Sequence, residues 1–357
     1  MAEPNPTTPS APTVSKMTIH MSGLLCDVYG LSELAAKRPA SVSCLWLFHG
    51  RLQSKEIMGD FASRVVSRHA TQQQPPLGGG RGLIAVAFDQ RNHGTRLVLD
   101  TANGSWRDGN ATHAVDMFGM VAGMVSDTRG LMDVVEGYVK NVLALAGGGG
   151  GGEWQWELDQ HLALGVSLGG HSTWQALFAE EMIEAGVVII GCPDYMDLMM
   201  DRAKKSKLAT WRSEDSGASF LGSRDFPPDL LDACLNRDPK GILFGTGVIP
   251  PTTEDVSEAE KQRLRGLLDA HHVKGKKFLV CSGADDKLVP YDKSRAFIDF
   301  FEMATKSWYA DAGVTFENVV YEGVGHTFSE GMVEDSIRFL LDAVKNAGGR
   351  VGGKAKI

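Results

Sequence analysis

The first candidate for chemistry in this chain is a serine between an apolar run and a series of glycines, in the segment LALGVSLGGHSTW at residues 162–174. Gly165 and Gly169 flank Ser167 in the pattern G-x-S-x-G, which is typical of a sharp turn between a strand and a helix. Such a turn holds the serine in strained backbone geometry and lifts its hydroxyl clear of the sheet. We therefore predict that Ser167 is a nucleophile, against the alternative of a serine in an ordinary glycine-rich turn.

A serine hydroxyl is a poor nucleophile near neutral pH, so Ser167 needs a base to take its proton and a third group to orient that base. After such a turn, the acid and then the histidine follow the serine along the chain. Of the ten histidines, only His326 lies beyond the strand expected to carry the acid, in the segment YEGVGHTFSE. His326 is therefore the predicted base, and the alternative is a polar surface residue in a glycine-flanked loop.

Two neighbouring carboxylates, Asp285 and Asp286, are the candidates for the acid. Gly283, Asp286, Val289 and Pro290 fill the pattern G-x-x-D-x-x-V-P, which resembles the acid motif of the α/β-hydrolase superfamily. The resemblance favours Asp286, and Asp285 remains the alternative. A buried carboxylate at this point would hold the histidine in the correct tautomer and stabilise its charged form.

The segment FHGR at residues 48–51 resembles the oxyanion loop of the same superfamily. The resemblance, which extends from about residue 17 to residue 347, implies that the backbone N–H groups of Arg51 and Leu168 form an oxyanion hole. A histidine such as His49 is normally structural in this loop, and His49 and Gly50 are also candidate substrate-binding residues. The loop differs from the HGGG loop of lipases, which argues against a lipase for bulky esters.

The segment FDQRNHGTR at residues 88–96 resembles a turn that braces the site in this superfamily. The resemblance implies that Asp89, Arg91 and His93 are structural rather than catalytic.

By resemblance, the reaction would be acyl transfer to water through an acyl-enzyme on the serine. No metal or other cofactor is expected, because the sequence contains no H-E-x-x-H motif. The adjacent pair His271 and His272 cannot easily converge on one ion.

The elements that must position these residues follow an alternating pattern, in which short apolar runs are separated by amphipathic stretches. Continuously apolar runs are typical of parallel strands covered by helices on both faces, so the pattern predicts a doubly wound, mostly parallel α/β sheet. The resemblance implies that this sheet is that of the α/β-hydrolase fold. Residues 17–30 are expected to add an antiparallel pair at the leading edge. The expected strands span residues 43–50, 82–89, 161–167, 186–193, 276–283 and 314–323.

One long interval, residues 194–273, separates two expected strands by far more than a usual connection. It contains helical patterns of its own, so we interpret it as a helical cap inserted after the strand that follows the nucleophile helix. Tyr195, Met196 and Met199 are its candidate substrate-binding residues, because methionines and aromatic rings suit an apolar group. The alternative is that these side chains form the cap's own core.

The expected domain boundaries divide the chain into a core of residues 17–193 and 274–347 and the cap between them. Residues 1–16, rich in Pro, Thr and Ser, are expected to be a disordered tail, and residues 348–357 form a second tail. Glycine runs at 78–80 and 147–152 are expected to be flexible surface linkers rather than phosphate loops, because neither is followed by Lys and then Ser or Thr.

The composition of the 357-residue chain is that of an ordinary globular protein, with 43% hydrophobic and 22% charged residues. Its formal net charge of -8 argues against nucleic acid or an anionic membrane as a partner. No apolar run approaches the roughly 18 residues of a membrane span, and the N-terminus lacks the features of a signal peptide. The odd number of five cysteines without C-x-x-C spacing indicates reduced thiols, so a cytoplasmic location is expected.

These observations predict a serine hydrolase that cleaves a carboxylic ester, or a lactone or thioester, of a small to medium apolar substrate. A serine peptidase or an acyltransferase with the same three residues is an alternative. A second alternative is a small-molecule binding protein of the same fold with little turnover. The sequence specifies no oligomeric state.

Overall fold

A computed structural model describes residues 12–72, 80–146, 154–252 and 255–347 of the chain. In these ranges the chain forms a single eight-stranded sheet. The strands are β1 (Lys16–Met21), β2 (Leu24–Tyr29), β3 (Ser41–Phe48), β4 (Arg81–Phe88), β5 (Glu157–Val166), β6 (Ile183–Ile189), β7 (Lys277–Gly283) and β8 (Thr315–Tyr321).

The helices connect these strands and flank the sheet. They are α1 (Leu31–Lys37), α2 (Gly59–Gln72), α3 (His113–Met132), α4 (Val135–Leu145), α5 (Leu168–Ala179), α6 (Tyr195–Lys205), α7 (Pro228–Arg237), α8 (Pro239–Phe244), α9 (Glu258–Ala270), α10 (Asp292–Lys306) and α11 (Glu330–Lys345). Short 3-10 helices are η1 (Lys55–Met58), η2 (Gly94–Arg96), η3 (Asp100–Asn103), η4 (Trp106–Asp108), η5 (Ala218–Phe220) and η6 (Ala310–Ala312).

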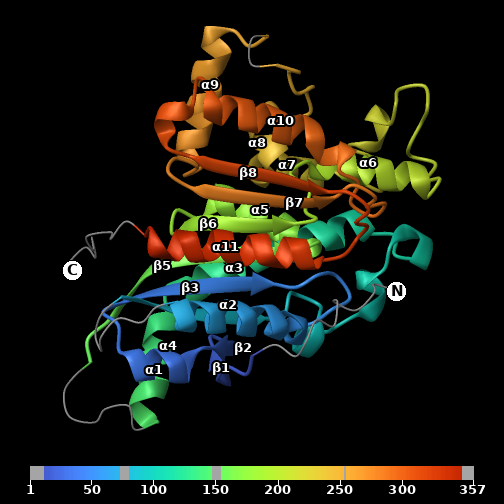
Figure 1. Cartoon of the computed structure of the whole chain (residues 1–357). Helices are drawn as coiled ribbons and strands as arrows, with labels where there is room; N and C mark the ends of the chain where they lie inside the picture. The colour runs from blue at the N-terminus through green and yellow to red at the C-terminus, as the bar shows by residue number, and fades with distance from the viewer. Residues whose placement is uncertain (1–11, 73–79, 147–153, 253–254, 348–357) are drawn as a thin grey trace, which may run out of the picture.

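The strand order is β1-β2-β4-β3-β5-β6-β7-β8. The strand β2 runs antiparallel to both of its neighbours, and every pairing from β4 to β8 is parallel. Helices α2 and α11 lie on one face of the sheet, whereas α3, α4 and α5 lie on the other (Figure 1). The carboxyl ends of the parallel strands therefore meet at one edge, which is the right-hand side of Figure 1.

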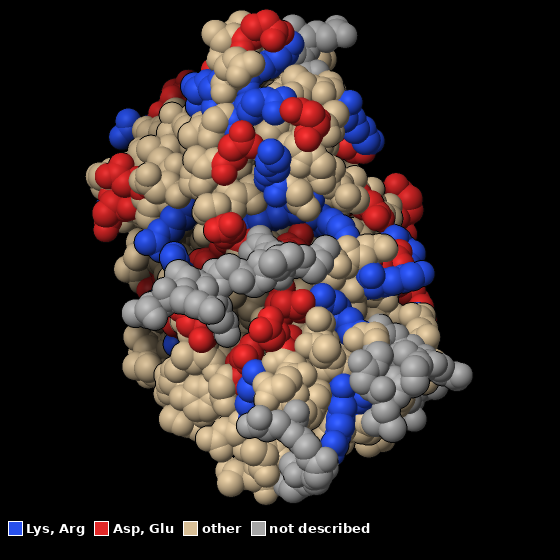
Figure 2. Space-filling model, turned by 90° about the vertical axis from the view of Figure 1, so that its left-hand side faces the viewer, with Lys and Arg blue, Asp and Glu red and all other residues tan. Residues whose placement is uncertain are grey.

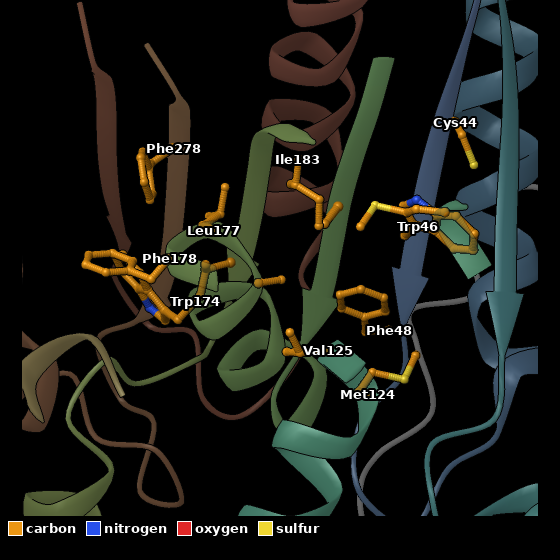
Figure 3. Packing of buried hydrophobic residues seen from close by; sticks show 14 of the residues in the cluster. Cys44, Trp46, Phe48, Met124, Val125, Trp174, Leu177, Phe178, Ile183 and Phe278 are labelled. Atoms are coloured by element: carbon orange, nitrogen blue, oxygen red, sulfur yellow. The ribbon is translucent and has the colours of Figure 1, made fainter. Parts of the chain in front are cut away.

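Alternating side chains along the central strands enter two separate cores, one on each face of the sheet. In β3, Trp46 and Phe48 pack into the core beneath α3 and α5, and Leu45 and Leu47 pack into the core beneath α2 and α11. Figure 3 shows part of the first core, in which Trp174 of α5 lies near Phe278 of β7 with their ring centroids 5.9 Å apart. Because both faces are covered, nearly all residues of the central strands are buried.

The six expected parallel strands are all present, within a few residues of their predicted ends. The expected antiparallel pair near the N-terminus is also confirmed, as β1 and β2. The tail predicted at residues 1–16 lies mostly outside the described residues, and Ser15 is anchored because its backbone N–H donates to Glu33 Oε1 at 2.9 Å. The tail at 348–357, the linker at 147–152 and all but Gly80 of the linker at 78–80 lie outside the described residues.

The segment predicted as a cap, residues 194–273, packs in two parts. Its first part, α6, η5 and α7, forms a small core with α3 at the carboxyl edge of the sheet. In its second part, Leu243 of α8 and Leu264 and Leu268 of α9 join the core that also contains α5 and α10. Only the first part therefore lies beside the turn that carries Ser167.

The face at the amino ends of the strands carries acidic and basic side chains side by side (Figure 2). The five cysteines are all buried and none forms a disulfide. Within the described ranges, none of the helices is both long and apolar enough to cross a bilayer.

Candidate active site

Ser167 occupies the turn between β5 and α5, at the carboxyl edge of the sheet. Its backbone has φ 56° and ψ -110°, a conformation that residues other than glycine rarely adopt. The N–H of Ser167 donates to the carbonyl of Ile189 at 2.9 Å, and its carbonyl accepts the first helical bond from His171 at 3.0 Å. These bonds hold the turn in its strained form and direct the serine hydroxyl away from the sheet.

The two glycines of the G-x-S-x-G pattern are required by close backbone approach. A Cβ at Gly165 would collide with the carbonyl oxygen of Gly169, and a Cβ at Gly169 would collide with the carbonyl oxygen of Phe48. The two glycines therefore let α5 lie directly against the ends of β5 and β3.

The structure brings Ser167, His326 and Asp286 together, although 159 residues separate Ser167 from His326. The Oγ of Ser167 lies 2.9 Å from Nε2 of His326, and Nδ1 of His326 lies 2.8 Å from Oδ2 of Asp286. The carboxylate of Asp286 accepts a hydrogen bond from the Nδ1–H of His326, which leaves Nε2 unprotonated and able to accept the serine proton. The His326 side chain is 21% exposed and that of Asp286 is 1% exposed, so only the histidine can be reached by solvent.

The second oxygen of Asp286 is held by the loop that follows β7. Its Oδ1 accepts hydrogen bonds from the N–H groups of Leu288 at 2.8 Å and Val289 at 2.9 Å. The side chain of Asp285 is exposed, and its N–H donates to the carbonyl of Val324 at 2.9 Å. Of the two candidate acids, Asp286 is therefore the one that contacts the histidine.

Gly283 explains how the histidine loop reaches the acid. A Cβ at Gly283 would collide with the carbonyl oxygen of Val324 and would approach that of Gly325 to 2.6 Å. The glycine that ends β7 lets this loop pass close to the strand, so that His326 comes within hydrogen-bond distance of Asp286.

The oxyanion hole expected from the resemblance to the superfamily would use the backbone N–H groups of Leu168 and Arg51. Leu168 is the first residue of α5, where N–H groups have no partner within the helix and the dipole is positive. In the other loop, Gly50 N–H donates to Gln53 Oε1 at 3.1 Å and Leu52 N–H donates to His93 Nε2 at 3.0 Å. Between these two donors, the N–H of Arg51 forms no hydrogen bond with any described residue.

His49 lies behind this loop and is fully buried. Its Nδ1 donates to the Gly50 carbonyl at 2.8 Å, and its Nε2 accepts from the N–H of Gln90 at 3.0 Å. Burial lowers the pKa of His49 to about 4, so the ring is neutral near pH 7. His49 does not line the cavity beside Ser167, whereas Gly50 does.

The turn after β4 braces the oxyanion loop. Asp89 accepts hydrogen bonds from the N–H groups of Lys55 at 2.8 Å and Thr95 at 2.9 Å, and Arg91 forms an ion pair with Asp127. Together with the bond from Leu52 to His93, these contacts tie the loop to β4 and α3, in agreement with the structural role that the sequence predicts.

A cavity of about 50 Å³ lies beside Ser167 and His326. The sequence singled out Gly50, Arg51, Ser167 and His326, but not the apolar side chains in its wall. A usable signal was position in the chain for most of them: three lie within about ten residues after the oxyanion loop, one directly precedes Ser167 and one lies two residues after His326, whereas Ile190 follows β6 and carries no such signal. The missed apolar residues are Ile57, Met58, Phe61, Val166, Ile190 and Phe328.

Tyr195, Met196 and Met199 do not line this cavity. They are 1%, 1% and 0% exposed and pack with Phe220 and other side chains in the small core at the edge of the sheet. The hydroxyl of Tyr195 donates to the carbonyl of Ala114 at 2.7 Å, which satisfies its only polar group. Leu168 belongs to the same core, so these residues support the turn from behind.

No protein-family model matches the chain. A search of curated proteins also finds no match.

Several solved structures are similar to the chain at low sequence identity. TT1662 of Thermus thermophilus has a TM-score of 0.47 and 16% identity, over 94% of this chain and 100% of that one. The esterase Pf2001 of Pyrococcus furiosus has a TM-score of 0.45 and 14% identity, over 92% of each chain. An esterase of Pyrobaculum calidifontis has a TM-score of 0.46 and 14% identity, over 93% of this chain and 84% of that one.

The order and directions of the strands, with a strained serine between β5 and α5, identify this chain as a member of the α/β-hydrolase fold.

Proposed function

We propose that this protein is a serine hydrolase that cleaves carboxylic esters through an acyl-enzyme on Ser167. The observation that supports this most strongly is the chain of two hydrogen bonds, 2.9 Å from Ser167 to His326 and 2.8 Å from His326 to Asp286. A nucleophile, a base and a group that orients the base are what this chemistry requires.

The reaction begins when Ser167 Oγ attacks the carbonyl carbon of the ester and its proton moves to Nε2 of His326. The N–H groups of Leu168 and Arg51 would donate to the oxyanion, and Asp286 would stabilise the charged imidazole. The intermediate then collapses, the C–O bond to the alcohol breaks, and His326 returns the proton to the leaving alcohol. Water attacks the acyl-enzyme by the same route and releases the acid and the free serine.

The size of the cavity beside Ser167 supports a small acyl group. With a volume of about 50 Å³, the cavity is much smaller than the roughly 300–1,000 Å³ of pockets that take drug-sized ligands. Its apolar wall, including Phe61 and Phe328, suits a short hydrocarbon chain. We therefore propose acyl groups of two to four carbons, carried by an ester, a lactone or a thioester.

The test is hydrolysis of p-nitrophenyl esters with acyl chains from acetate to octanoate. We expect kcat/KM to be highest for the short chains and to fall beyond four carbons, because longer chains exceed the cavity. The same panel with Ser167→Ala should show a loss of about 10⁶-fold in kcat. A rate that is unchanged in Ser167→Ala would exclude the proposed nucleophile.

A serine-directed fluorophosphonate probe separates the alternatives. Labelling of Ser167 without cleavage of any ester would indicate a peptidase or an acyltransferase. Absence of labelling would indicate a binding protein of this fold.

The five cysteines are buried thiols without disulfides, which supports a reducing compartment such as the cytoplasm.

A further inference from the structure

A second cavity, of about 140 Å³, lies on the other side of Arg51. Arg51 lines both this cavity and the one beside Ser167, and Lys287 directly follows the acid Asp286. Basic side chains from four separate segments of the chain meet in its wall. We name it the basic cavity after these residues, which are Arg51, Arg107, Arg202, Lys205 and Lys287.

Arg202 is a guanidinium without an acidic partner. Its Nη1 donates to Nε2 of His113 at 3.3 Å and contacts the sulfur of Met117 at 2.9 Å, and its Nη2 donates to the carbonyl of Leu288 at 3.4 Å. Its Nε is buried and forms no hydrogen bond with any described residue. An arginine whose hydrogen-bond partners are all neutral lowers the stability of the folded protein, because its charge is partly removed from water and contacts no counter-ion.

His113 cannot supply that counter-ion. Its Nδ1 donates to the carbonyl of Gly104 at 2.9 Å, so its Nε2 is the acceptor for Arg202. Burial, with Arg202 and Arg51 nearby, lowers the pKa of His113 to about 3. The imidazole is therefore neutral near pH 7 and accepts a hydrogen bond without balancing the charge.

Arg51 adds a second partly buried guanidinium. Its Nη1 donates to the carbonyl of Asn103 at 2.6 Å, which is again a neutral partner. Burial lowers the pKa of Arg202 to about 10, and the positive charge of Arg51 contributes to the same shift. The two guanidiniums therefore repel each other, and a shared anion would remove that repulsion.

Two carboxylates lie near these guanidiniums without contacting them. Asp201 lines the cavity and forms its ion pair with Lys205 at 2.6 Å, and the exposed Asp108 accepts from the N–H and hydroxyl of Ser105 at 2.9 and 2.7 Å. Arg51, Arg107, Arg202 and Lys287 therefore outnumber the one cavity-lining carboxylate, which is already paired. The concentration of positive charge is local, because the whole chain has a formal net charge of -8. The opposite face carries both signs side by side (Figure 2).

We propose that the basic cavity binds an anionic group of the ester substrate, a phosphate or a carboxylate on the alcohol portion. This rests on the proposed function, with the small acyl group in the cavity beside Ser167 and Arg51 between the two portions. Guanidiniums recognise both anions by paired hydrogen bonds.

The experiment compares acetate esters in pairs, in which one member carries an anionic group and the other is neutral. The acetate of 4-hydroxybutyrate is paired with that of 4-hydroxybutyramide, and the acetate of 3-hydroxypropyl phosphate with its dimethyl phosphotriester. We expect kcat/KM to favour the anionic member by about 10- to 100-fold, the value of a hydrogen bond to a charged group. The pair with the larger ratio of kcat/KM, anionic over neutral, identifies the anion. This ratio should fall as the salt concentration is raised.

Arg202→Gln should reduce this ratio by about 10- to 100-fold, and Arg202→Lys should restore part of it. The matched control is Arg224→Gln, which removes the same charge from a side chain that is 81% exposed and lines neither cavity. A ratio near one in the wild type, or a ratio that Arg202→Gln leaves unchanged while p-nitrophenyl acetate is hydrolysed, overturns the anion site and leaves the proposed function intact.

A binding measurement tests the site independently of turnover. Inorganic phosphate should raise the Tm of the wild type and of Arg224→Gln, and the increase should be lost in Arg202→Gln. Without phosphate, Arg202→Gln should be at least as stable as the wild type, because it removes an uncompensated charge. A lower Tm together with an unchanged response to phosphate would show that Arg202 is structural, and would overturn the proposal even if no ester is cleaved.

Discussion

At the scale of single residues, the site depends on a serine held where its backbone is strained. The φ of 56° and ψ of -110° at Ser167 are accessible to glycine but costly for a side chain. We predict that Ser167→Gly unfolds at a higher urea concentration than Ser167→Ala, with a difference of roughly 1–3 kcal/mol. Equal midpoints would contradict the strain, and both variants should lack esterase activity.

The two neighbouring aspartates give a matched pair for the acid. Asp286→Asn removes the charge that orients and stabilises His326, so kcat for a p-nitrophenyl ester should fall about 10⁴-fold. Asp285→Asn changes an exposed side chain one position away, and its kcat should stay within about twofold of the wild type. A large loss from Asp285→Asn with little from Asp286→Asn would reverse the assignment.

The sequence predicted Ser167, His326 and Asp286 because their order and short motifs are local signals. It did not predict Arg202, whose importance depends on partners from other segments. A basic run on an amphipathic helix normally faces solvent, and nothing in the run itself indicates that one guanidinium lies beside Arg51 and lacks an acid. The aromatic and methionine side chains of α6 were expected near the substrate, but periodicity cannot distinguish a cavity wall from a core.

At the scale of elements, the turn between β5 and α5 requires contacts that only glycines permit. Gly169→Ala would force a methyl group against the carbonyl of Phe48 and separate α5 from β3. We predict a loss of about 1–3 kcal/mol in unfolding free energy and a loss of activity. The measurement is urea unfolding together with esterase assays.

The control for that substitution is Gly266→Ala in α9. A Cβ at Gly266 would meet no atom within 4 Å, so the change should stabilise the protein by about 0.5–1 kcal/mol through helix propensity alone. If Gly266→Ala lowered the unfolding free energy as Gly169→Ala does, the close approach at Gly169 would not be the cause of the lost stability.

The strands were predictable because each is a short apolar run with glycine or charged residues beyond it, and parallel pairing buries both faces. The division of residues 194–273 was not predictable in the same way. The apolar stripe of α9 shows that one face is buried, but Leu264 and Leu268 do not reveal which surface covers them. That surface is the core shared with α10, which lies later in the sequence.

At the scale of the whole molecule, buried histidines make stability depend on pH. Burial lowers the pKa of His49 and His69 to about 4 and that of His113 and His171 to about 3. The unfolded chain takes up these protons near pH 6.5, whereas the folded protein does not until much lower pH. Their stabilising effect is therefore complete above pH 6.5 and is lost as the pH falls toward 4 and below.

Between pH 6 and pH 5 the four histidines should lower the unfolding free energy by about 4 kcal/mol, since each contributes up to about 1.4 kcal/mol per pH unit. Asp238 opposes part of this fall, because burial raises its pKa well above the usual value and the folded protein takes up that proton before the unfolded chain does. The net change should still be a loss of stability, because the histidines are more numerous. Urea unfolding at several pH values measures the slope. A flat profile would mean that the histidines are solvated, and the exposed His20→Gln should leave the slope unchanged.

The measurement that tests the central claim most directly is the site of modification by a fluorophosphonate. After reaction with the intact protein, mass spectrometry should find one phosphonate on the peptide LALGVSLGGHSTW, at Ser167, and the reaction should be lost in Ser167→Ala and strongly slowed in His326→Gln. A protein that cleaves esters while its Ser167 remains unmodified and its label lies on another residue would contradict the account.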